Sequence, residues 1–139
     1  MSAKIFANIF SGLEEAYGTY DIQKEQTNGK STGKARIVRE LRTNATWEDH
    51  LSGKGAGIGI IPINAENQCR WGSIDIDMYN FNHKELIDKI AQLKLPLIVC
   101  RSKSGGAHVF LFVKEWVDAK IIQETLNTIS ATLRYSGSE

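Results

Sequence analysis

The sequence has few of the residues that mark specialised classes of protein. Its 139 residues include only two cysteines, Cys69 and Cys100, which match neither a disulfide framework nor a paired metal-ligand spacing. Seventeen basic residues nearly cancel sixteen acidic ones, so the net charge of +1 indicates no general affinity for nucleic acid or membrane surfaces. No apolar run reaches membrane-spanning length, and the amino terminus lacks the features of a signal peptide. We therefore expect a cytoplasmic protein with reduced thiols, in which phosphate binding depends on local clusters of charge.

The composition that is present fits one globular domain. With 42% hydrophobic residues, the chain can bury a single contiguous core. We expect one domain over residues 1–139, with an amino-terminal helix and basic loop region over 1–56 and a core over 57–139. The first helix is expected to extend up to Gly18, because apolar residues recur at helical spacing before it. These residues are Ile5, Ile9, Leu13, Ala16 and Tyr17.

The segment from Asp21 to about Asn44 is polar and basic, with weak periodicity. We expect a loop here, followed by one short strand near residues 35–39. Its basic side chains either contact the phosphates of a nucleic acid or simply form a solvated face. They are Lys24, Lys30, Lys34, Arg36, Arg39 and Arg42.

From Gly57 onward the pattern predicts six elements in the order strand, strand, helix, strand, strand, helix. The strands are expected at 57–63, 69–78, 95–101 and 107–113, and the helices from Asn82 and from Ala119 to about Tyr135. Asn82 and Glu85 fit a capping box at the start of the first of these helices. The inward-facing residues of the two helices are expected to be Leu86, Ile87, Ile90, Leu93, Ile121, Ile122, Leu126, Ile129 and Leu133. This order predicts an α+β fold in which both helices cover one face of an antiparallel sheet.

Two carboxylates lie one residue apart in the strand sequence Ile74-Asp75-Ile76-Asp77. Because side chains alternate across a strand, Asp75 and Asp77 share one face, and the two isoleucines share the other. Adjacent acids repel each other, and a shared divalent cation removes that cost, so the pair predicts a Mg²⁺ or Mn²⁺ site. The alternative is a solvent-facing sheet surface or a helix-capping role.

A turn rich in serine and glycine follows the third core strand. Its glycines permit close backbone approach, its amides and hydroxyls can bind phosphate oxygens, and two basic side chains supply positive charge. We expect it to bind a triphosphate, although such a segment can also be only a turn. The candidate binding residues are Arg101, Ser102, Lys103, Ser104, Gly105, Gly106 and His108.

The strand after this turn places His108, Phe110 and Phe112 on one face, which we expect to be the face of the two acids. The aliphatic residues Val109, Leu111 and Val113 then pack under the helices. A lone histidine is often structural, but here it accompanies an acidic pair and a candidate phosphate-binding turn. Another histidine, His83, is expected to be exposed in the first turn of a helix.

The sequences WGSIDID and LIVCRSKSGGAHVFLF together resemble the archaeo-eukaryotic primase superfamily, especially the primase-polymerase domains of phage replication proteins and of TOTE conflict systems. The resemblance extends over nearly the whole chain. It implies a core of the RNA-recognition type (RRM-like), with Asp75 and Asp77 as ligands of catalytic Mg²⁺ or Mn²⁺. It also implies that Gly106, Ala107 and His108 form the small-residue, any-residue, histidine motif of the family, in which the histidine contacts the nucleotide's phosphates.

The implied activity is template-directed nucleotidyl transfer, which synthesises primers or DNA with two divalent metals. The implied partners are nucleoside triphosphates, a DNA template with its primer, and further domains of a longer protein such as a helicase. The family completes its metal site with a third carboxylate on a later strand. Neither Asp118, which precedes the last helix, nor the terminal Glu139 convincingly replaces it. We therefore expect an amino-terminal portion of a primase-polymerase or a shortened relative, with little or no activity alone.

Two other functions remain open at this level. A non-catalytic module could bind single-stranded nucleic acid by stacking bases on Trp71, Phe110 and Phe112. A metal-dependent nuclease could use the acidic pair and His108 on a phosphodiester. The acidic pair weighs against the first alternative, because carboxylates repel a phosphate backbone. For Trp47, His50 and Trp71, stacking on a base competes with a simple packing role.

Overall fold

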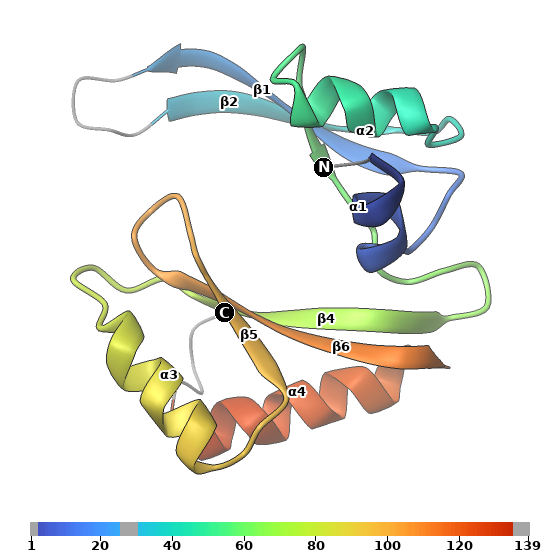
Figure 1. The fold of residues 1–139 in the computed structure, drawn as a ribbon. Helices are drawn as coiled ribbons and strands as arrows, with labels where there is room; N and C mark the ends of the chain where they lie inside the picture. The colour runs from blue at the N-terminus through green and yellow to red at the C-terminus, as the bar shows by residue number, and fades with distance from the viewer. Residues whose placement is uncertain (1–2, 26–30, 135–139) are drawn as a thin grey trace. The chain divides into compact units, whose positions relative to one another are not determined.

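The computed structural model describes residues 3–25 and 31–134, which form an α+β fold, as expected (Figure 1). These residues contain four helices and two three-stranded antiparallel sheets, with strand orders β2-β1-β3 and β4-β6-β5. The elements are α1 (Ala3–Ile9), β1 (Tyr17–Glu25), β2 (Ser31–Val38), α2 (Asn44–Leu51), β3 (Gly57–Gly59), β4 (Gln68–Ile76), α3 (His83–Gln92), β5 (Leu97–Arg101), β6 (Ala107–Asp118) and α4 (Ala119–Leu133). The chain divides into two compact units, Met1–Gln68 and Cys69–Glu139.

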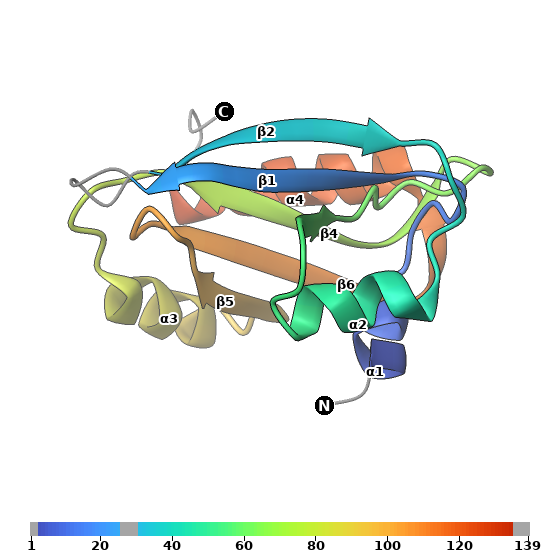
Figure 2. The same cartoon turned by 90° about the horizontal axis from the view of Figure 1, so that it is seen from above.

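The first unit contains a long hairpin that the sequence analysis did not predict. β1 and β2 pair from Tyr17 opposite Val38 to Glu25 opposite Ser31, and the two strands lie side by side in Figure 2. The expected loop is therefore wrong for residues 21–25 and 31–34, which are strand, and residues 26–30 lie outside the described residues. The short strand expected near 35–39 exists as the end of the longer β2. Much of this sheet is solvent-exposed, so its strands can carry polar side chains. The sequence therefore lacks the alternation of apolar and polar residues that marks a half-buried strand.

The first helix is shorter than expected. α1 ends at Ile9, and Tyr17 belongs to β1, so the expectation of one helix up to Gly18 is wrong. The backbone instead passes close to Ile61: the amide of Leu13 donates to the Ile61 carbonyl at 2.9 Å, and a Cβ at Gly12 would lie only 2.0 Å from that oxygen. This contact between distant segments overrides the local helical spacing.

Helix α2 was also missed. It begins after Thr43, whose side chain and backbone form a reciprocal capping box with Thr46. Its one buried residue, Trp47, is 4% exposed and lies 6.0 Å, between ring centroids, from Phe6 of α1. The packing interpretation of Trp47 is therefore confirmed. Helical periodicity gave little signal because only one residue of the helix is buried.

The strands expected at 57–63 and 69–78 exist, but they do not form a strand-turn-strand unit. β3 pairs with β1 in the first sheet, whereas β4 belongs to the second sheet. The turn between them is real, because the Asn64 side chain accepts hydrogen bonds from the amides of Glu66 and Gln68. It joins two sheets instead of closing a hairpin.

The second unit matches the predicted pattern most closely. β5 and β6 form the expected hairpin, and α3 and α4 lie on one face of the sheet (Figure 1). The side chain of Asn82 accepts a hydrogen bond from the Glu85 amide, which confirms the predicted start of α3. The buried core comprises Ile74, Ile76, Leu86, Ile90, Ala107, Val109, Ile129 and Leu133. Three of the residues expected to face inward, Ile87, Leu93 and Ile121, are instead exposed.

Both cysteines are free thiols, and Cys69 is buried while Cys100 is exposed. Burial and, to a smaller extent, the nearby carboxylate of Asp118 raise the pKa of the Cys69 thiol. Within the described part of the chain, no helix has both the length and the apolar character needed to cross a membrane.

Candidate active site

Strand β4 presents its acidic residues on the side away from the helices. Ile74 and Ile76 are buried at 8% and 1% exposure, whereas the Asp75 side chain is 68% exposed. Asp77 follows directly after the last residue of β4 and is also exposed. The predicted alternation is therefore confirmed. The carboxylates keep most of their hydration because they do not enter the core.

A tight turn over residues 102–106 connects β5 to β6, and we call it the serine-glycine turn. The Ser102 amide donates to the Gly106 carbonyl at 3.0 Å, and the Gly105 amide donates to the Ser102 carbonyl at 3.1 Å. The hydroxyls of Ser102 and Ser104 lie 3.1 Å apart. Gly105 has a φ of +94°, which favours glycine. The turn thus has a defined shape set by its own hydrogen bonds.

The serine-glycine turn lies directly against the end of the acidic strand. A Cβ added to Gly106 would lie 1.9 Å from the Ile76 carbonyl oxygen and 3.4 Å from the Asp77 Cα. Only glycine permits this approach without a backbone shift. The close contact explains physically why a small residue stands two positions before His108.

Two side-chain contacts join the acids to the turn and the following strand. The Nε2 atom of His108 lies 3.3 Å from Oδ1 of Asp75, and the Ser104 hydroxyl donates to Oδ1 of Asp77, also at 3.3 Å. His108 is the second residue of β6, and its side chain is 44% exposed. The structure therefore brings Asp75, Asp77, Ser104 and His108 together. Their assignment as a catalytic site remains a prediction.

The remaining predicted binding residues flank this cluster. Arg101 is the last residue of β5, pairs with Ala107 across the hairpin and is exposed. Lys103 is exposed within the serine-glycine turn. Both cations thus lie in the segment whose hydroxyl contacts Asp77, and they are accessible to an anionic ligand.

Sequence reasoning missed a neighbour of the turn. The prediction that His83 is exposed is wrong, because this side chain is partly buried and its Nε2 lies 2.8 Å from the carbonyl oxygen of Gly106. The contact joins residues 23 positions apart. Its only sequence signal was the position of His83 immediately after the helix-capping Asn82.

A third acidic ligand is not found in the part of the chain that the structure describes. Across residues 3–25 and 31–134, no group of three His, Cys, Asp or Glu side chains is arranged to hold a metal ion. Asp118 instead caps α4, where its Oδ1 accepts a hydrogen bond from the Lys120 amide at 2.8 Å. Glu139 lies outside the described residues.

The face of the second sheet that carries Asp75 and His108 also carries aromatic rings. The Phe110 ring is stacked on Phe112, with centroids 5.8 Å apart, and lies 6.1 Å from Trp71. The ring of His108 meets Phe110 edge-on at 6.2 Å. Cys100 lies directly opposite His108 in the hairpin, so its thiol shares this face. The predicted facing of Phe110 and Phe112 is confirmed.

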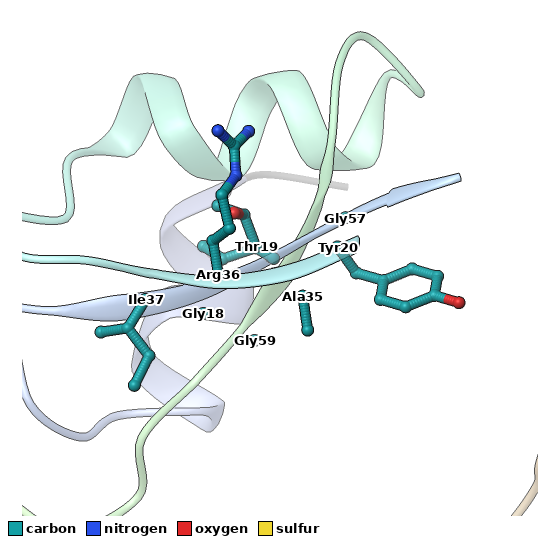
Figure 3. A pocket seen from close by; sticks show the side chains of 9 residues that line it. Gly18, Thr19, Tyr20, Ala35, Arg36, Ile37, Gly57 and Gly59 are labelled. Carbon is teal, nitrogen blue, oxygen red and sulfur yellow. The ribbon is translucent and has the colours of Figure 1, made fainter. Parts of the chain in front are cut away.

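A separate, shallow depression of about 450 Å³ lies on the first sheet (Figure 3). Its small lining residues are Gly18, Ala35, Gly57 and Gly59. In Figure 3, Arg36 projects to the opposite side of the sheet from Ile37. The Arg36 guanidinium forms an ion pair of 2.7 Å with Asp21, so this member of the basic segment already has an acidic partner. The side chains of Lys24 and Lys30 lie outside the described residues.

A family model describing the archaeo-eukaryotic primase domain of the TOTE conflict system matches residues 2–137. A comparison with curated protein sequences finds no match. The matched region includes β4 with its acids, the serine-glycine turn and His108. Because the match covers nearly the whole chain, this protein belongs to the archaeo-eukaryotic primase domain family of TOTE conflict systems.

Proposed function

We propose that this chain carries the metal-binding and nucleotide-binding part of a site for template-directed nucleotidyl transfer. Membership in the family implies a nucleotidyltransferase of the primase or polymerase type. The observation that supports the residue assignment is the pair of contacts that join Asp75 to His108 and Asp77 to Ser104. These contacts support the proposal because they join the acidic pair to the turn that we propose binds phosphate, an arrangement that suits transfer from a nucleoside triphosphate onto a DNA primer.

Asp75 and Asp77 would hold Mg²⁺ or Mn²⁺. Both are exposed carboxylates, and oxygen ligands of this kind suit these cations. When bound, such ions favour ionisation of the primer hydroxyl and stabilise the pyrophosphate leaving group. Asp75 lies 3.3 Å from the imidazole of His108, and Asp77 accepts a hydrogen bond from the Ser104 hydroxyl, so both carboxylates face the polar groups of the proposed site.

The serine-glycine turn would bind and orient the triphosphate. Gly105 and Gly106 leave its backbone open to close approach, while Arg101 and Lys103 add positive charge on either side of Ser102. The Nε2 of His108 can donate a hydrogen bond to a phosphate oxygen from the sheet face that carries Asp75. Together these groups would hold the phosphates in line for attack by the primer.

Within residues 3–25 and 31–134, no third acid joins Asp75 and Asp77, and this limits what the chain is expected to do alone. Two carboxylates support weaker metal binding than three, so we expect nucleotide binding with manganese but little or no primer extension. A purified chain that extends a primer, with activity abolished by Asp75→Ala, would contradict this expectation.

Calorimetric titration tests the nucleotide site directly. A nucleoside triphosphate is titrated with Mn²⁺ into the wild-type chain and into the Asp75→Ala, His108→Ala and Asp88→Ala variants. Asp88 is a matched control, because it is an exposed acid on α3 that forms an ion pair with Lys84, one helical turn away. We expect saturable binding in the wild type and the control, and its loss in the other two variants. Absence of binding to the wild type would refute the proposal.

The aromatic rings on the same face support a second candidate, a module that binds single-stranded nucleic acid. Bases stack on such rings with little sequence preference, and the stacked pair Phe110 and Phe112 offers a suitable surface. Fluorescence anisotropy with a labelled oligonucleotide and no metal separates the two candidates. Metal-independent binding that Phe112→Ala weakens, without nucleotide binding, would favour this module. Cleavage of the same oligonucleotide with Mn²⁺ would favour a nuclease.

A further inference from the structure

His83 connects helix α3 to the serine-glycine turn. Its Nε2 lies 2.8 Å from the Gly106 carbonyl oxygen, and its ring meets the Phe81 ring edge-on with centroids 5.1 Å apart. A carbonyl oxygen can only accept, so Nε2 must carry the proton in this contact. The imidazole is therefore a donor held in a fixed orientation by a neighbouring ring.

The acceptor of this hydrogen bond is the oxygen that also closes the turn. The Gly106 carbonyl accepts from the Ser102 amide at 3.0 Å and from His83 at 2.8 Å. Gly106 also lies against the Ile76 carbonyl at the end of β4. The turn is thus fixed from two directions, by α3 through His83 and by β4 through direct backbone contact.

We propose that His83 is a positioning residue that preorganises the serine-glycine turn for a triphosphate. This inference rests on the proposed function, because it assumes that the turn binds phosphates. A turn that is already ordered binds an anion without first losing conformational freedom. Removing the His83 donor leaves the turn with its internal bonds and its contacts with Ile76 and Asp77, but without the hydrogen bond from α3. The turn is then less ordered before the ligand arrives, so the affinity for the triphosphate falls because binding must also order the turn.

Three variants separate positioning from simple packing. His83→Phe keeps an aromatic ring beside Phe81 but removes the donor. His83→Gln restores an N–H at nearly the distance of Nε2 from the backbone. Lys84→Ala is the matched control, because it changes the next residue of α3, whose side chain is 83% exposed. Thermal melting of each variant establishes that the protein is folded before binding is measured.

Affinities for a nucleoside triphosphate and the corresponding monophosphate are measured with Mn²⁺ by calorimetry. We expect the Kd for the triphosphate to rise about tenfold in His83→Phe, the loss typical of one hydrogen bond, and to recover largely in His83→Gln. The Kd for the monophosphate should rise less in His83→Phe, because the monophosphate has fewer phosphate oxygens that the turn can bind. The control should bind as the wild type does.

The outcomes are distinct. Failure of the wild type to bind nucleotide refutes the proposed function, and this inference with it. Wild-type binding with an unchanged Kd in His83→Phe refutes only the role of His83, as does an equal loss for triphosphate and monophosphate. If His83→Phe does not fold, His83→Gln is compared with His83→Asn, whose donor is one bond closer to the backbone. Equal triphosphate affinities in these two variants would also refute the role.

Discussion

Replacing Gly106 with alanine tests the contact between the serine-glycine turn and β4. The new Cβ would lie 1.9 Å from the Ile76 carbonyl oxygen, whereas real Cβ atoms essentially never approach within 3.0 Å. The two backbone segments would have to separate by about 1 Å. Since the nearest atoms belong to the backbone, no side-chain rotation can relieve the overlap.

The expected cost follows from the kind of atom that must move. Overpacking a buried position typically costs 1–3 kcal/mol, and a backbone clash falls at the upper end, so we expect a loss of about 3 kcal/mol in the free energy of unfolding. Gly105→Ala is the matched control, because its Cβ would meet nothing within 4 Å and only its φ of +94° opposes the change. A cost of about 1 kcal/mol is expected there.

Urea denaturation followed by tryptophan fluorescence measures both changes. Trp71 lies in the same unit as the turn and reports on its unfolding. The reasoning is refuted if Gly106→Ala is no more destabilising than Gly105→Ala, because the backbone clash would then have no energetic consequence.

Three further predictions concern the rest of the chain. Gly12→Ala should lower the free energy of unfolding by about 3 kcal/mol, because the new Cβ would meet a backbone oxygen at 2.0 Å. Gly33→Ala should lower it by less than about 1 kcal/mol, because its Cβ would meet the movable end of a tyrosine ring. Equal costs in urea denaturation would contradict this. Asp75→Asn should change the free energy of unfolding by less than about 1 kcal/mol, because its contact with His108 is exposed to solvent, while abolishing nucleotide binding with Mn²⁺ in calorimetry. A stability loss that accounts for the binding loss would make Asp75 structural. The exposed Cys100 should be alkylated quickly at neutral pH. Cys69 should be alkylated only after denaturation, because its thiol is buried and the raised pKa of this thiol keeps it protonated. Peptide mass spectrometry detects the order of alkylation, and equal rates at the two cysteines would contradict the prediction.

Much of the second unit could be predicted from the sequence because its signals are local. Ile74 and Ile76 alternate with Asp75, and one face of that strand enters the core, so periodicity and burial agree. The cap at Asn82 and the hairpin between β5 and β6 likewise depend on neighbouring residues. Where a helix lies at the surface, as at Ile87, apolar spacing overestimated burial.

The first unit was poorly predicted because its structure depends on partners distant in sequence. β1 pairs with β2 and also with β3, which lies more than thirty residues beyond it. The contact of Gly12 with Ile61 ends a helical pattern that local spacing favours. In the site, the bond from His83 to Gly106 is of the same kind: neither residue alone indicates the other.

The basic segment has a consequence for self-association. β2 lies at the edge of the first sheet, and an edge strand offers unpaired backbone groups to a second copy of the chain. Lys34 is exposed on this strand and Arg39 follows its end, whereas the charge of Arg36 is already paired with Asp21. A second edge of the same kind would bring like charges together, which discourages fibre-like stacking. Lys34 and Arg39 therefore oppose pairing of this edge with the same edge of a second copy.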